Sequence, residues 1–361
     1  MSNRIDRQEA FSGTRETPEA LQFDERRLER WLRDRIEGFD GPLDVRQFKG
    51  GQSNPTYRVA TPHQAYVLRR KPPGKLLPSA HAIDREYRVM AALGKVGFPV
   101  PKVHLLCEDD SVIGTAFYLM DEVVGRVFWE PEMPASDRIE RAAVYDAMNA
   151  AMAQLHSFDP VELDLADFGK PEGYVARQIA RWSKQYRASQ TETIPEMDRL
   201  IDWLPDNLPP ENPARLVHGD FRLDNMILDA VEPRILAVLD WELSTLGDPV
   251  ADFTYHCMQW EMPPSEEGAG VGSLVGCNLE VLGIPALADY IAAYERRTGL
   301  VVGAHIDFYF AYNFFRLGAI LQGIVGRVRD GTATNANAAA MADQVRPLAE
   351  TAWRFAQKAG A

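Results

Sequence analysis

Apolar positions along the first third of the chain are spaced as in strands. Short apolar runs predict five strands, of which the first three are antiparallel: 45–48, 56–60, 65–70, 102–108 and 115–121. The glycine-containing stretch 50–55 predicts the turn between the first two strands, and helical spacing is present over 21–39 and 84–93. We therefore expect a small, mostly antiparallel sheet that carries an inserted helix.

Beyond residue 125 the spacing becomes that of long helices. Helices are predicted over 136–156, 174–190 and 194–204, and again from residue 248 to the end, with a short β interlude at about 215–240. The change near 122–125 marks a hinge between two lobes. The predicted organisation is a flexible leader over 1–20, an N-terminal lobe over 21–123 and a helical C-terminal lobe over 124–361.

Composition and charge narrow the functional class. The 361 residues are 46% hydrophobic, and 52 acidic against 39 basic residues give a net charge of −13. This balance argues against nucleic-acid binding and against docking on an anionic membrane, both of which need a basic face. The three cysteines are far apart, and the polar N-terminus lacks an apolar signal region. The longest apolar run, 317–325, is too short to span a bilayer. We expect a cytoplasmic globular protein.

The segment HGDFRLDN, His218–Asn225, carries the strongest chemical signal. It fits H-x-D-x-x-x-x-N, the spacing of a kinase catalytic loop. In such a loop a carboxylate accepts or orients the proton of the attacking hydroxyl, and an amide oxygen holds Mg²⁺ without adding negative charge beside the phosphates. Asp220 suits the first role and Asn225 the second. A polar turn between strands has the same composition, so the motif needs support elsewhere.

Asp240 provides this support. It follows the apolar run 235–239 and lies 15 positions after Asn225. A carboxylate at the end of such a strand can face the same metal ion, and Mg²⁺ prefers one or two carboxylates together with phosphate oxygens and water. An aspartate in a turn after a strand is common, but the two motifs together are much harder to obtain by chance.

The strand 65–70 offers a cation. Val67 and Arg69 share one face of the strand because alternate residues point to opposite faces. If this face is turned toward a nucleotide, Arg69 reaches the α- and β-phosphates, and Glu86 on the following helix orients it as an ion pair. Without the catalytic loop, both residues would be read as ordinary surface charges.

The turn before the second strand could also contact phosphates. Its residues Gly51, Ser53 and Asn54 would place backbone N–H groups over them, as glycine turns do. The signal is weak, because the turn is not G-x-G-x-x-G and hairpins often contain glycine.

These residues identify a family resemblance. HGDFRLDN and VLDWELSTLGDPVADF resemble the aminoglycoside phosphotransferase family, a branch of the protein-kinase-like fold, from about residue 48 to about residue 326. The segment YVLRRKPPGKLLPSAHAIDREYRVMAAL resembles the kinase-like domain attached to some long-chain acyl-CoA dehydrogenase family members. The resemblance implies an α+β, bilobal fold with a small antiparallel N-lobe and a larger helical C-lobe.

Carried over residue by residue, the resemblance implies transfer of a phosphoryl group from ATP (or GTP) to a small-molecule hydroxyl. Asp220 takes the place of the base, and Asn225 and Asp240 match the Mg²⁺ ligands. Glu86 matches the ion-pair partner, and Arg69 stands where the family usually has lysine, so that a planar fork replaces a point charge.

Two further expectations follow from the resemblance. The segment Met120–Val123 matches the hinge that contacts adenine. The likeness to the acyl-CoA dehydrogenase members suggests a hydroxyacyl-CoA as the acceptor. Aminoglycoside, macrolide, choline or homoserine acceptors are the alternatives, as is a pseudokinase that binds nucleotide without transfer, which the arginine at position 69 motivates.

Overall fold

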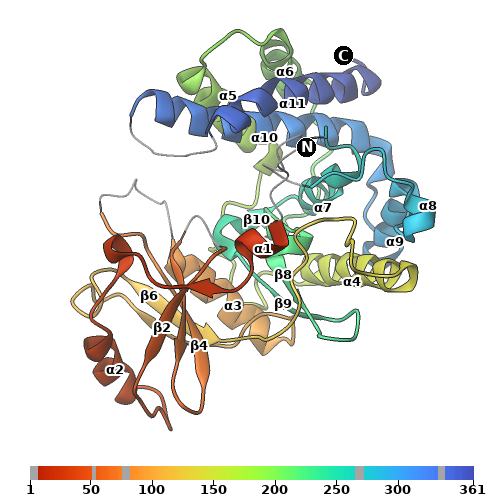
Figure 1. Cartoon of the computed structure of the whole chain (residues 1–361). Coiled ribbons are helices and arrows are strands. Elements are labelled where there is room, and N and C mark those ends of the chain that lie inside the picture. The colour runs from red at the N-terminus through yellow and green to blue at the C-terminus, as the bar shows by residue number, and fades with distance from the viewer. Residues whose placement is uncertain (1–6, 51–53, 75–81, 265–271, 332–337) are drawn as a thin grey trace, which may run out of the picture.

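Six strands form one antiparallel sheet in the N-terminal part of the chain (Figure 1). The computed structural model describes residues 7–50, 54–74, 82–264, 272–331 and 338–361. The strand order is β1-β2-β3-β4-β6-β5. The strands are β1 (Thr14–Arg15), β2 (Asp44–Phe48), β3 (Thr56–Ala60), β4 (Ala65–Arg70), β5 (Val103–Cys107) and β6 (Phe117–Asp121). The five strands expected from the sequence are confirmed. They could be predicted because the alternation of side chains along a strand is a local signal.

Part of the expected leader belongs to this sheet. Helix α1 (Arg7–Phe11) precedes β1, and β1 pairs with β2 through Thr14 opposite Phe48. The phenyl ring of Phe11 lies 5.2 Å from the ring of Trp129. The leader is therefore ordered over these residues, and its strand satisfies backbone groups that the edge of the sheet would otherwise leave unpaired.

The two faces of the sheet are covered by different helices. Helix α2 (Glu25–Arg33) packs its buried Leu28 and Leu32 on the face that holds Leu68. Helix α3 (Ile83–Lys95) packs on the opposite face, which holds Val67. Strand alternation thus turns Arg69 toward α3. Helix α2 is shorter than the predicted 21–39. It begins after Asp24, whose carboxylate caps it by accepting a hydrogen bond from the Arg27 N–H, and it ends at Arg33.

Helices dominate the remainder of the chain (Figure 1). They are α4 (Arg138–Ser157), α5 (Tyr174–Ser189), α6 (Pro195–Asp206), α7 (Pro249–Cys257), α8 (Leu279–Leu282), α9 (Leu287–Thr298), α10 (Ile306–Arg329) and α11 (Ala338–Lys358). The three helices expected between residues 125 and 205 are confirmed to within two residues at each end. In the part of the chain described here, no helix is both long and apolar enough to cross a bilayer.

The β interlude consists of two short antiparallel pairs. Strand β7 (Arg215–Val217) pairs with β10 (Thr245–Gly247), and β8 (Met226–Leu228) pairs with β9 (Ile235–Val238). The hairpin β8–β9 lies beside the segment that leaves the sheet, where Arg126 and Leu228 exchange backbone hydrogen bonds of 2.8 Å. Gly125 is needed at this crossing, because a Cβ there would lie 2.1 Å from the Leu228 carbonyl oxygen.

Candidate active site

The predicted catalytic loop connects β7 to β8 and brings Asp220 and Asn225 together. The Asn225 side-chain amide donates to the Asp220 carboxylate at 3.2 Å and to its backbone carbonyl at 2.9 Å. The other carboxylate oxygen of Asp220 accepts a hydrogen bond of 3.1 Å from the Tyr255 hydroxyl and lies 3.2 Å from the Arg222 guanidinium. Asp220 is therefore held in one orientation by three neighbouring side chains.

One face of helix α7 packs against this loop and holds it in place. Asp252 accepts hydrogen bonds of 2.8 Å from the backbone N–H groups of both His218 and Gly219. One turn later the Tyr255 hydroxyl donates to Asp220, and the His256 ring donates to the Phe221 carbonyl at 3.1 Å. These three residues share a face because they are three and four positions apart. That spacing was the available sequence signal, but sequence reasoning did not assign any of the three to the site.

The histidines near the loop make structural contacts. The His218 ring donates to the Leu239 carbonyl at 2.9 Å, which ties the loop to the end of β9. The buried His156 ring contacts the Asp252 carboxylate at 3.2 Å and the Tyr294 hydroxyl at 2.6 Å. Burial opposes the charge on Asp252, but the hydrogen bonds from His156 and from the His218 N–H hold the pKa of this carboxyl below its ordinary value.

The hairpin β8–β9 places Asp240 beside Asn225. Asn225 immediately precedes β8, and only Leu239 separates Asp240 from the end of β9. The Leu239 N–H donates to the Asn225 carbonyl at 2.8 Å. Asp240 has a left-handed backbone, with φ at +63°. Such a conformation is uncommon for a residue with a side chain and is often found at functional positions. The structure thus joins the two predicted metal ligands through one hairpin.

The donor set formed by these two residues suits Mg²⁺. The Asn225 amide nitrogen is used on Asp220, which leaves its carbonyl oxygen as a ligand, and Asp240 supplies a carboxylate whose side chain is 28% exposed. Among the residues described, no group of three or more histidine, cysteine, aspartate or glutamate side chains forms a metal cage. An incomplete oxygen set of this kind is what Mg²⁺ uses when phosphate oxygens and water complete its shell.

Arg69 connects the sheet to this cluster. Its guanidinium lies 2.9 Å from Glu86 on α3, and another of its nitrogens lies 2.5 Å from Asp240. Burial works against the charged form of Arg69, but Glu86 and Asp240 together raise its pKa above the ordinary value. The ion pair predicted between Arg69 and Glu86 is therefore present, and the cation is directed at a predicted metal ligand.

Glu86 is fixed by two more donors. The side-chain amide of Asn54 donates to it at 2.9 Å and the Tyr118 hydroxyl at 3.1 Å, and Glu86 itself is 1% exposed. Asn54 contributes a buried side chain here, in addition to the backbone role expected for its turn. Gly51 and Ser53, which were expected to contact phosphates, lie outside the described residues.

The two expected hinge residues lie at the end of the sheet. Met120 in β6 pairs with Val67 of β4, two positions from Arg69, and its side chain is buried on the face shared with α3. Val123 follows β6 and is half-buried.

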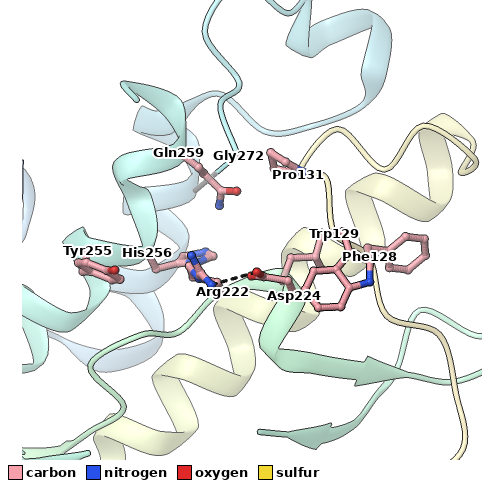
Figure 2. Close-up of a pocket in the computed structure, with 10 residues that line it drawn as sticks. Phe128, Trp129, Pro131, Arg222, Asp224, Tyr255, His256, Gln259 and Gly272 are labelled. Atoms are coloured by element: carbon pink, nitrogen blue, oxygen red, sulfur yellow. Dashed lines mark hydrogen bonds and ion pairs between the residues drawn. The ribbon is translucent and has the colours of Figure 1, made fainter. Parts of the chain in front are cut away.

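A pocket of about 370 Å³ opens beside the catalytic loop (Figure 2). Figure 2 shows the ion pair of Arg222 with Asp224 between Trp129 on one side and Tyr255 and His256 on the other. The rest of the wall is made by Phe128, Pro131, Leu223, Gln259 and Gly272. The walls thus combine aromatic and apolar side chains with the polar side chains of Arg222, Asp224, His256 and Gln259. The only carboxylate among the lining residues is already paired with an arginine.

A second pocket, of about 480 Å³, lies near Tyr174 and Asp248 and contains none of the predicted site residues. Asp248 instead caps α7, because its carboxylate accepts the N–H groups of Val250 and Ala251. Of these two pockets, the one beside Arg222 adjoins the catalytic loop.

Comparison with known proteins agrees with this geometry. Residues 44–299 match the model of the phosphotransferase enzyme family. Acyl-CoA dehydrogenase family member 10 of Mus musculus is 44% identical over 96% of the chain, and member 11 of Rattus norvegicus is 43% identical over 96%. The chain spans only 32% and 45% of these two proteins, so less than half of each.

Solved structures show the same fold. One is a Ralstonia eutropha protein described as a suspected aminoglycoside phosphotransferase. Its sequence is 50% identical, its TM-score is 0.84, and the match covers 93% of this chain and 99% of the Ralstonia chain. The aminoglycoside phosphotransferase APH(4)-Ia, solved with ADP and hygromycin B, is 15% identical with a TM-score of 0.58, over 91% of this chain and 98% of its own. The fold is thus the bilobal, kinase-like α+β fold that was predicted, and the chain belongs to the phosphotransferase enzyme family.

Proposed function

We propose that the protein is a Mg²⁺-dependent O-phosphotransferase that moves the γ-phosphoryl group of ATP to a hydroxyl of a small molecule. One observation carries the proposal: Asp220, Asn225 and Asp240 meet through one hairpin, and Arg69 is directed at them from the other lobe. Complexes of APH(4)-Ia with ADP and with AMP-PNP support an adenine nucleotide as the donor. Nothing comparable supports GTP.

Each residue has a distinct task in this reaction. Asp220 accepts the proton of the acceptor hydroxyl while the hydroxyl oxygen bonds to the γ-phosphorus. The bond between the γ-phosphorus and the oxygen that bridges it to the β-phosphate breaks, which releases ADP. Burial raises the pKa of Asp220, with Asp224 and Asp240 adding to the rise and Arg222 opposing it, which makes the carboxylate a stronger base than a solvated one. Asn225 and Asp240 would hold Mg²⁺, which supplies positive charge to the phosphate oxygens.

Other residues would bind the nucleotide. Arg69 binds phosphate oxygens from the sheet side, and Glu86 keeps it in place. Gly51, Ser53 and Asn54 would contact the phosphates, and Met120 and Val123 would contact the adenine. We accordingly assign the nucleotide lobe to 21–123 and the lobe with the catalytic loop and acceptor site to 124–361. The free thiols Cys107, Cys257 and Cys277 favour a cytoplasmic location, since reducing compartments preserve them.

We infer that the acceptor is a hydroxyacyl-CoA. The relatives named for acyl-CoA dehydrogenase activity support this class. The pocket beside Asp220 supports it independently, because Phe128, Trp129 and Leu223 offer apolar surface to an acyl chain. A polycationic aminoglycoside would need several unpaired carboxylates, whereas Asp224 is held by Arg222 at 2.9 Å.

A phosphorylation screen tests both the reaction and its acceptor. Purified protein, ATP and Mg²⁺ would be incubated with separate panels of hydroxyacyl-CoAs, aminoglycosides, macrolides, choline and homoserine, and each product examined by mass spectrometry. We expect one added phosphoryl group on the hydroxyacyl-CoAs alone, and none when Asp220→Asn replaces the wild type. Transfer confined to another panel would refute the acceptor class. Metal-dependent ATP hydrolysis without transfer to any panel would favour the pseudokinase.

A further inference from the structure

Helix α10 contributes a buried arginine to the back of the catalytic loop. Arg316 is 6% exposed, and its guanidinium donates to the Gly219 carbonyl at 3.1 Å. The same guanidinium lies 4.9 Å from the centre of the Tyr255 ring. Arg316 is 97 positions from Gly219 in sequence, and nothing in the sequence motifs indicated a contact between them.

No carboxylate within the described ranges forms an ion pair with this cation. Its Nε is buried and has no hydrogen-bond partner there. Burial opposes the charge on Arg316, but neighbouring tyrosines, including Tyr312 and Tyr174, and the nearby Asp220 raise its pKa above the ordinary value. A buried charge without an opposite charge is costly to keep. The contacts of Arg316 with the catalytic loop indicate its role.

The Gly219 carbonyl belongs to the same rigid peptide plane as the N–H of Asp220. Arg316 holds this plane at its oxygen, and the His218 ring accepts the Asp220 N–H at 3.2 Å on the other side. Gly219 has φ at +85°, and a Cβ there would lie 2.9 Å from Leu243. The backbone that carries Asp220 is therefore clamped at both ends of one peptide group.

Arg316 also supports the side chain of Asp220. Its guanidinium carbon lies over the ring of Tyr255, and the hydroxyl of that ring donates to the Asp220 carboxylate at 3.1 Å. A guanidinium is suited to both contacts at once, because it is broad enough to cover an aromatic ring and carries several N–H donors. An ammonium group would keep the charge and the possibility of a bond to Gly219, but would cover less of the ring.

We propose that Arg316 is a positioning residue for phosphoryl transfer: it orients Asp220 by fixing the Gly219–Asp220 peptide from one side and Tyr255 from the other. The proposal rests on the function assigned above to Asp220. Because Arg316 is buried behind the loop, its loss should slow the transfer step without weakening the binding of either substrate.

The first test needs no substrate. Hydrogen–deuterium exchange of the amides of 218–222 would be measured by mass spectrometry in the wild type, Arg316→Met and Arg316→Lys. Arg329→Met, an exposed arginine on the same helix that pairs with Asp330, is the matched control. We expect exchange at 218–222 to rise at least tenfold in Arg316→Met, less in Arg316→Lys, and not at all in the control. Unchanged exchange in Arg316→Met would overturn the proposal even if the protein phosphorylated nothing.

The second test uses steady-state kinetics with ATP and a hydroxyacyl-CoA from the screen. In Arg316→Met, kcat should fall roughly 100-fold while KM for both substrates stays within about threefold, the pattern of a lost transition-state contribution. Arg316→Lys should recover part of kcat, and Tyr255→Phe, which keeps the ring but removes the hydroxyl, should lose about tenfold. A raised KM for the acyl-CoA with kcat unchanged would instead make Arg316 a binding site for an anionic group of the acceptor.

Discussion

Arg69, on strand β4 of the sheet, donates to the carboxylate of Asp240, which follows strand β9 of the other lobe, at 2.5 Å. One guanidinium thereby joins the helix α3 glutamate, Glu86, to a proposed metal ligand. The two lobes meet at the site itself, and a change to any one of these three charges alters the environment of the other two.

Replacing Arg69 with methionine should destabilise the protein strongly. Glu86 would remain buried without its cation, and such broken pairs cost about 3–5 kcal/mol. The free energy of unfolding in urea measures the effect. Arg58→Met is the control, because its pair with Glu122 is partly exposed and such pairs contribute about 1 kcal/mol or less. Equal losses in the two variants would show that the Arg69 pair is no more important than a surface contact.

Asp220→Asn should retain the fold and lose the reaction. The amide has nearly the same shape as the carboxylate but cannot accept the proton of the hydroxyl, so kcat should fall by about 100-fold to 10,000-fold. Thermal unfolding and ATP affinity should change little. Turnover close to that of the wild type would contradict the assignment of Asp220 as the base.

Asp240→Asn should weaken the binding of Mg²⁺. The amide oxygen is a poorer ligand for a hard cation than the carboxylate. We expect the Mg²⁺ concentration for half-maximal activity to rise at least tenfold. Glu242→Gln is a suitable control, because Glu242 lies 3.7 Å from the same arginine but was not assigned as a ligand. An unaltered Mg²⁺ titration in Asp240→Asn would remove this residue from the metal site.

Stability should decline in acid because of His256. Burial lowers the pKa of His256 from 6.5 to about 4 in the folded protein. The unfolded chain then binds the proton more tightly, so the contribution of this residue is complete above about pH 6.5 and is lost as the pH falls toward 4. The loss amounts to about 3 kcal/mol. Urea unfolding between pH 7 and pH 4 measures it.

The matched variants for that experiment are His256→Asn and the exposed His63→Asn. The first keeps an N–H that can donate to the Phe221 carbonyl but cannot titrate, so its stability should depend less on pH. The second should follow the wild type. An identical acid slope in all three proteins would assign the pH dependence to other groups.

Sequence reasoning succeeded where the signal is local. The strands at 45–48, 56–60 and 65–70 and the relation of Asp220 to Asn225 depend on spacing alone, and the pair formed by Arg69 and Glu86 followed once the two were placed on adjacent elements. The contacts of Asp252, Tyr255 and Arg316 with the catalytic loop join residues 33 to 97 positions apart. Only the packing of α7 and α10 against the loop determines them, and no short pattern encodes that packing.

The leader illustrates the same limit. Its polar composition resembles that of a disordered tail, yet Thr14 and Arg15 pair with β2 because the edge of the sheet offers unpaired backbone groups. Backbone pairing requires little of the side chains. A two-residue strand therefore leaves almost no trace in the hydrophobic pattern.

The hairpin β8–β9 bears on how related sites can be found in other genomes. Asn225 and Asp240 sit at its open end, and the turn at its closed end includes Val231, which is 83% exposed. Residues inserted in that turn would lengthen the chain between the two ligands and leave the ligands where they are. The interval of 15 positions is thus a property of this chain. A search that requires it would pass over homologues whose hairpins are longer, while one that asks for two paired strands would retain them.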